Sequence, residues 1–153
     1  MANPTRSPVH RGLFRTGPSR EITLLGGWSP SASLAHFPRR DRCPYTGAED
    51  VVDVDLPQRG TIWAFTEVTA APPGYSGRVP YGIGVVGLEV NGTTLRVVTR
   101  LVDGTDPGPR IGQQAVLVAD EVVDSDGEIL HTWAFQPVEA ADRTDADDAE
   151  GRS

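Results

Sequence analysis

The side chain best suited to metal or nucleophilic chemistry belongs to Cys43, the only cysteine in the chain, which stands three residues before Thr46. Structural zinc is held by four sulfur or nitrogen ligands, commonly in two close pairs. Pairs of that spacing would fall at Ser29 and Ala32 and at Cys43 and Thr46, but three of these four residues cannot bind zinc. We therefore expect a degenerate, rubredoxin-like zinc-ribbon module that folds without metal, and we expect no cofactor.

A catalytic role for Cys43 would need a base or an electropositive setting beside the thiol. The nearby sequence supplies arginines but no base, and the histidines of the chain are His10, His36 and His131. We interpret His131, within a strand pattern, as structural, and His36, within a loop, as exposed. No catalytic residue is predicted, and Cys43 is interpreted as a remnant of the ribbon.

The length, hydropathy and net charge of the chain exclude some classes of protein. Its 153 residues suffice for one domain with a core, or for a small domain plus an appendage. No apolar run approaches the roughly 20 residues that span a bilayer, and no signal-like stretch begins the chain, so a cytoplasmic location is expected. The formal net charge of −7 argues against a protein that binds nucleic acid by neutralising phosphates.

The second two thirds of the chain has a β pattern throughout. The dipeptide Asn91-Gly92 is a strong hairpin signal because both central residues of a type I′ turn need positive φ. Short, evenly spaced strands favour a small barrel or sandwich, and a five-stranded OB-fold barrel is our first choice. The predicted strand segments are Val51–Leu56, Thr61–Val68, Tyr81–Val90, Thr93–Val102, Ala115–Val123 and Ile129–Phe135.

We expect four regions along this all-β chain. Residues 1–20 form a flexible basic arm, and residues 21–50 form the degenerate zinc-ribbon-like module. Residues 51–138 form the OB-fold domain. Residues 139–153 are an acidic tail with little to bury, which is typical of disordered segments.

Several short pieces, taken in order, resemble the zinc-ribbon/OB-fold family of acyl-CoA-associated accessory proteins, formerly a domain of unknown function. The resemblance covers about residues 24–138 and departs from the family at the zinc ligands. Its pieces are Leu24-Leu25-Gly26, Phe37-Pro38-Arg39, Cys43-Pro44-x-Thr46-Gly47, Gly60-Thr61-Ile62-Trp63-Ala64-Phe65-Thr66, Pro72-Pro73-Gly74-Tyr75, Val79-Pro80-Tyr81-Gly82-Ile83-Gly84-Val85-Val86 and Ile111-Gly112.

The resemblance implies a non-catalytic accessory subunit rather than an enzyme. Such a subunit would form a hetero-oligomer with a thiolase-fold or related acyl-CoA enzyme, such as a thiolase, a lipid-transfer-protein-like aldolase, a condensing enzyme or a hydratase. It would help to shape the acyl-CoA site of that enzyme, in lipid or polyketide metabolism. Two alternatives stay open: an OB-fold that binds single-stranded nucleic acid, and an independent enzyme that acts on thioesters.

Two stretches are candidate contacts for the partner or for the CoA moiety of its substrate. Arginine forks match phosphate oxygens, so the cluster around Arg39 and Arg40 is one candidate, with a solvated turn as the alternative. The second is the loop 72–81, since tyrosine and arginine are enriched in interface hot spots and proline stiffens a loop. A plain barrel loop is the alternative there. The predicted contacts are Arg39, Arg40, Tyr75, Arg78, Pro80 and Tyr81.

Overall fold

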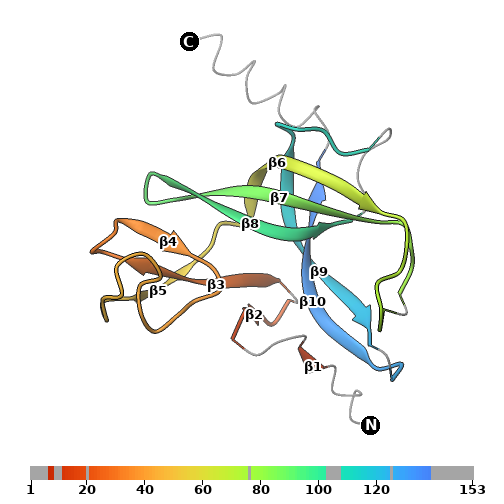
Figure 1. The fold of residues 1–153 in the computed structure, drawn as a ribbon, viewed down its shortest axis with the longest axis horizontal. Coiled ribbons are helices and arrows are strands. Elements are labelled where there is room, and N and C mark those ends of the chain that lie inside the picture. The colour runs from red at the N-terminus through yellow and green to blue at the C-terminus, as the bar shows by residue number, and fades with distance from the viewer. Residues whose placement is uncertain are drawn as a thin grey trace.

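The computed structural model describes the following parts of the chain: residues 7–8, 12–19, 21–75, 77–102, 108–124 and 126–138. This part contains ten strands and no helix, so none of its segments is a helix that could cross a membrane. The strands, drawn in Figure 1, are β1 (Ser7–Pro8), β2 (Phe14–Thr16), β3 (Ile22–Ser29), β4 (Leu34–His36), β5 (Val52–Asp55), β6 (Arg59–Val68), β7 (Tyr81–Val90), β8 (Thr93–Leu101), β9 (Gln114–Val123) and β10 (Ile129–Pro137).

Five of these strands close into a barrel. The sheet has the order β1-β10-β8-β7-β6-β9, and an additional pairing of β9 with β10 closes it. β8 and β10 run parallel where Leu101 lies opposite Phe135, while the other barrel pairs are antiparallel. The predicted all-β, OB-fold class is therefore confirmed.

The turn between β7 and β8 forms as the sequence predicts. Asn91 has φ of 48° and Gly92 has φ of 81°, the two positive values that a type I′ turn requires. The turn between β9 and β10 is held by the Asp124 carboxylate, which accepts hydrogen bonds from the backbone N–H groups of Asp126 and Glu128, each at 2.9 Å. Local polar residues thus set both hairpin registers.

One strand of the barrel contains an extra residue. Between Ile62 and Ala64 the pairing of β6 with β7 shifts by one position, which makes Trp63 the additional residue of a β-bulge. Before the shift, Gly60 and Ile62 are buried in alternation. At the shift, Trp63 and Ala64 are consecutive and both exposed. The bulge therefore changes which residues of β6 face the barrel interior.

After the bulge, Phe65 lies on the inner side of β6. It pairs with Gly84, where an added Cβ would lie 2.6 Å from Cδ1 of the buried Leu101. Trp63 instead covers the outside of β7, where a Cβ added to Gly87 would lie 2.3 Å from its Nε1. The two aromatic side chains, only two residues apart, thus lie on opposite sides of the sheet.

The N-terminal part of the chain forms a second, smaller sheet. β3 is its central strand and pairs antiparallel with β2, β4 and β5. The segment predicted as the first strand of the OB-fold domain is β5, and it pairs with β3 rather than with the barrel. The side chains of Leu24 on β3 and Leu56 after β5 join the same buried cluster as Val86 and Phe135 of the barrel.

The segment expected to be a flexible arm contributes ordered contacts. β1 pairs with β10, and β2 pairs with β3, so parts of residues 1–20 belong to both sheets. The Phe14 ring lies 6.1 Å from the ring of Trp133 on β10, and Phe37 meets Trp133 edge to face at 5.6 Å. The physical reason is the aromatic side chain at position 14, whose burial offsets the ordering of the backbone. Residues 139–153, predicted to be a disordered tail, lie outside the described residues.

Candidate functional site

A groove opens where the ends of the barrel strands meet the loop between β6 and β7. Its volume is about 650 Å³. Phe65 and Leu101 supply apolar walls, and the inward position of Phe65 follows from the bulge in β6. Three residues that the sequence singled out line it, namely Arg78, Pro80 and Tyr81. We refer to this hollow as the groove.

An ion pair lies at the wall of the groove. Arg100 Nε on β8 lies 3.2 Å from Asp120 Oδ2 on β9, and their side chains are only 26% and 20% exposed. The two atoms approach without forming an aligned hydrogen bond. The Arg100 guanidinium also lies over the ring of Tyr81, 5.2 Å from its centroid. The groove therefore combines apolar walls with the close pair of Arg100 and Asp120, and Glu67 and Arg78 line it as well.

The loop between β6 and β7 is held by its own aromatic residues. The rings of Tyr75 and Tyr81 lie 5.0 Å apart, and the Tyr75 hydroxyl donates a hydrogen bond to the Arg78 carbonyl at 3.0 Å. Both tyrosines are half-buried, whereas Arg78 and Pro80 are exposed. The structure thus brings Tyr75, Arg78, Pro80 and Tyr81 together in one loop, and their role as a contact surface stays a prediction.

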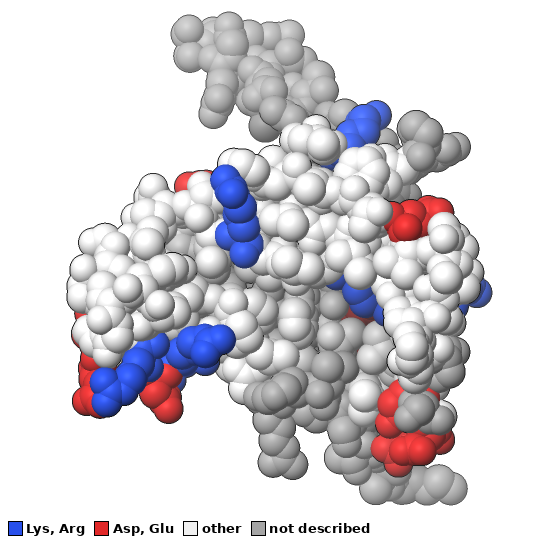
Figure 2. Space-filling model, viewed as in Figure 1, with Lys and Arg blue, Asp and Glu red and all other residues white. Residues whose placement is uncertain are grey.

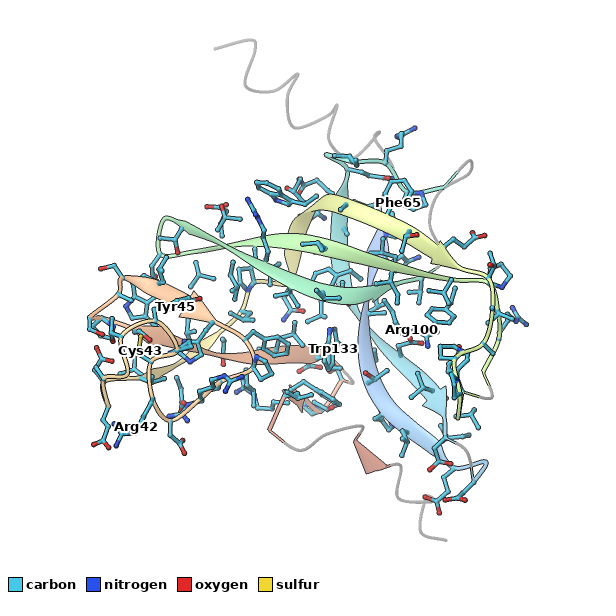
Figure 3. All side chains as sticks on the ribbon, in the orientation of Figure 1. Arg42, Cys43, Tyr45, Phe65, Arg100 and Trp133 are labelled. Atoms are coloured by element: carbon cyan, nitrogen blue, oxygen red, sulfur yellow. The ribbon has the colours of Figure 1, made fainter. Side chains whose placement is uncertain are left out.

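The arginine turn lies at the other end of the molecule. Figure 3 shows Arg42 beside Cys43 and Tyr45 on the small sheet, while Arg100 lies across the barrel from them. Arg39 contacts Asp53 and also Asp41, the latter at 3.1 Å, and Arg42 contacts Glu49. These acidic partners compete with a phosphate for the two guanidinium groups.

Arg40 differs from the arginines on either side of it. Among the described residues it makes no ion pair, and its side chain is exposed. The predicted contacts therefore divide into two surfaces, one around Arg40 and one around Tyr81, which Figure 1 places at opposite ends of the ribbon.

The predicted ribbon positions also meet in the structure. Cys43 is 2% exposed, and the Thr46 N–H points to its Sγ at 3.3 Å. Burial raises the pKa of the Cys43 thiol, but hydrogen bonding with Ser29, Thr46 and Tyr45 outweighs burial and lowers the pKa to about 7. No group of three or more His, Cys, Asp or Glu side chains suited to a metal occurs in the described part of the chain. The descent of this module from a zinc ribbon stays a prediction.

His36 lies in the interior rather than on the surface, so the expected exposure is wrong. The side chain is 4% exposed, and its Nε2 accepts a hydrogen bond from the Arg40 N–H at 3.2 Å. The ring fits because Gly27 has no side chain, since a Cβ there would lie 2.4 Å from Nε2. Burial is the main cause that lowers the pKa of His36, and the positive charges of Arg39 and Arg40 lower it further.

This lowered pKa predicts a pH-dependent stability. The unfolded chain takes up a proton near pH 6.5, the ordinary value for histidine, before the folded protein does. Unfolding therefore becomes easier as the pH falls below about 6.5, until the folded-state pKa is passed. Chemical denaturation between about pH 8 and about pH 5 should show this loss. His36→Gln should flatten the profile in that window, and an unchanged slope would contradict the assignment.

Comparison with known proteins supports the class of fold. Residues 53–120 match the family model described as "ChsH2, C-terminal OB-fold domain". A relative from Methanocaldococcus jannaschii, described as a "DUF35 domain-containing scaffold protein", is 25% identical over 119 residues, which covers 76% of this chain and 82% of the relative. A solved structure described as "Ltp2-ChsH2(DUF35) aldolase" has a TM-score of 0.58 and 23% identity, covering 75% of this chain and 84% of that one.

These matches support the class of fold first and then the resemblance. The class is an all-β protein whose main body is an OB-fold barrel. The barrel is similar to OB-fold domains of the DUF35 type, such as that of ChsH2, and this similarity confirms the resemblance found in the sequence.

The sequence missed three members of the site. Phe65 stands in a predicted strand, but nothing local shows which face of the sheet it occupies, because the bulge reverses the alternation. Arg100 and Asp120 stand on separate strands, and only barrel closure brings them to 3.2 Å. A signal for that pair would have required the register of β8, β9 and β10 relative to one another.

Proposed function

We propose that this chain is a non-catalytic accessory subunit that binds and supports a thiolase-fold or related acyl-CoA enzyme. The observation that carries the proposal is its similarity, over 76% of its length, to a protein described as a scaffold. The buried state of Cys43 supports it, since the hydrogen-bonding neighbours of the thiol are Ser29, Thr46 and Tyr45, none of which is a base. The partner class is thus an enzyme that supplies the chemistry itself.

The loop beside the groove suits such binding because it is ordered before the partner arrives. The contact between the tilted rings of Tyr75 and Tyr81 and the hydrogen bond to the Arg78 carbonyl restrict the loop in the free protein. A preorganised loop loses less conformational entropy on association, so more of the contact energy contributes to affinity. The second surface is the one around Arg40. Because Arg40 makes no ion pair among the described residues, its guanidinium is available to bind a phosphate of CoA in the complex.

Co-expression tests this proposal directly. The chain is produced together with the enzymes encoded by its neighbouring genes, and stable complexes are sought by affinity purification and size-exclusion chromatography. We expect one of these enzymes to co-purify and to gain activity or solubility with this chain present. Thioester turnover by the pure chain, lost in Cys43→Ser, would favour the independent enzyme instead.

The loop makes a specific prediction for that complex. Tyr75→Ala removes both the ring that packs against Tyr81 and the hydroxyl that donates a hydrogen bond to the Arg78 carbonyl, and should weaken binding about tenfold. Tyr75→Phe keeps the ring and should have a smaller effect. Tyr45→Ala, at a tyrosine 53% exposed on the small sheet, is the control. Titration calorimetry measures all three, and equal losses for Tyr75→Ala and Tyr45→Ala would argue against the loop.

A further inference from the structure

A second surface, separate from the groove, lies on the outside of the barrel. Ala64, Val85 and Val98 are neighbours across β6, β7 and β8, so their side chains share one face of the sheet. Val98 is 68% exposed and Trp63, which the bulge turns to the same side, is 45% exposed. We call these four residues the outer face. Figure 2 shows that much of this side of the molecule is uncharged.

The charges nearest to the outer face are mainly basic. The Arg96 guanidinium lies over the Trp63 ring, 3.9 Å from its centroid, and forms no ion pair among the described residues. Arg59 and Glu89 line a hollow of about 370 Å³ beside the same tryptophan. In a chain of net charge −7, this is an apolar patch with an arginine at its tryptophan end that has no ion-pair partner in the described part of the chain.

We propose that the outer face is a docking surface for the partner enzyme, which presents an apolar patch with a carboxylate opposite Arg96. This inference rests on the proposed function and adds to it a second contact, away from the groove. An exposed tryptophan with arginine over its ring has the composition of an interface hot spot. A carboxylate from the partner would supply the missing charge partner, which gives specificity as well as affinity.

Two other occupants, a second copy of the chain and single-stranded nucleic acid, fit the outer face less well. A second copy of the chain, docked by the same face about a two-fold axis near Trp63, would bring Arg96 of both copies together, and like charges oppose that contact. Single-stranded nucleic acid needs successive aromatic side chains on one platform. Here Trp63 and Phe65 lie on opposite sides of the sheet. The outer face therefore fits an acidic and apolar protein surface.

A pair of substitutions at one exposed site tests the proposal. Val98→Glu and Val98→Lys both remove the apolar side chain, but they add opposite charges beside Arg96. The affinity of each is measured for the neighbouring acyl-CoA enzyme that co-purifies with the unaltered chain. We expect Val98→Glu to raise the Kd at least about tenfold and Val98→Lys to raise it much less, because the lysine meets the acidic partner surface.

Controls separate this surface from folding and from the rest of the molecule. Ile129→Glu adds the same charge at a residue 45% exposed at the start of β10, and should leave the Kd unchanged. Melting temperatures of all variants confirm that the barrel is intact. Arg96→Ala should itself raise the Kd, because it removes the cation that faces the carboxylate of the partner.

Each remaining outcome would overturn the inference. If the two Val98 variants lose equal affinity, the partner surface opposite Arg96 is not acidic. If neither variant loses affinity, the outer face does not contact the partner, although the proposed function still stands. Self-association weakened by Val98→Glu would identify a second copy as the occupant. Quenching of Trp63 fluorescence by an oligothymidine would identify nucleic acid. Failure of every neighbouring enzyme to bind the unaltered chain would overturn the proposed function and this inference together.

Discussion

Trp133→Ala is expected to lower the free energy of unfolding by about 3 kcal/mol, the size typical of removing a large aromatic side chain from a packed site. Trp133 on β10 contacts Phe37 of the small sheet edge to face, with rings at 87° and centroids 5.6 Å apart. It also contacts Phe14 of the N-terminal segment at 6.1 Å. Figure 3 shows Trp133 between the small sheet and the barrel, so its loss loosens three parts of the fold at once.

Urea denaturation measures this effect, and two variants calibrate it. Trp133→Phe keeps an aromatic ring in the same place and should lose less stability. Trp63→Ala removes the same side chain from a site where it is 45% exposed, and should cost much less than Trp133→Ala. If the two tryptophan-to-alanine variants lose equal stability, Trp133 does not connect the parts as described. Deleting residues 1–20 should also lower the melting temperature, because it removes Phe14.

Gly60→Ala is expected to lower the free energy of unfolding by about 3 kcal/mol, the upper end of the usual cost of overpacking. A Cβ at Gly60 would lie 2.5 Å from Cγ1 of Val86 and 2.6 Å from the Gly87 carbonyl oxygen. The carbonyl belongs to the paired backbone of β7, so it cannot move aside as a side-chain end would. The strand pairing at the start of β6 must shift to accept the extra carbon.

A second glycine separates this contact from backbone strain. Gly47 has φ of 78° and nothing within 4 Å of an added Cβ. Gly47→Ala therefore lowers the free energy of unfolding only through its strained backbone conformation. That cost is about 1 kcal/mol. The midpoint of urea denaturation for both variants gives the comparison. Gly60→Ala losing no more than Gly47→Ala would show that the barrel can yield at this contact.

The sequence predicted the parts of the fold that local chemistry decides. The segment predicted as Tyr81–Val90 is the strand β7 with the same bounds, and Asn91-Gly92 forms the expected turn. Strand alternation and turn residues act over a few positions, so they can be read along the chain. The OB-fold class followed because few closed arrangements accommodate five such strands.

The parts that the sequence could not predict depend on distant pairings. Phe14 lies in an arm rich in proline, serine and arginine, and its packing depends on Trp133 of the distant strand β10. His36 looked exposed because the space that Gly27 leaves for its ring lies on another strand. The predicted contacts at Arg39 and Tyr75 fell on different surfaces because the small sheet and the loop extend from opposite ends of the barrel. Their roles in binding stay predictions.

The bulge at Trp63 also affects how relatives of this chain should be aligned. A relative without the extra residue keeps strict alternation along the equivalent strand, so each of its positions after the missing residue faces the other way in an ungapped alignment. An ungapped comparison would then pair Phe65, which lines the groove, with a solvent-facing residue. Where identity is near 25%, as with the archaeal relative, the placement of that single gap decides which aromatic residue is counted as shared.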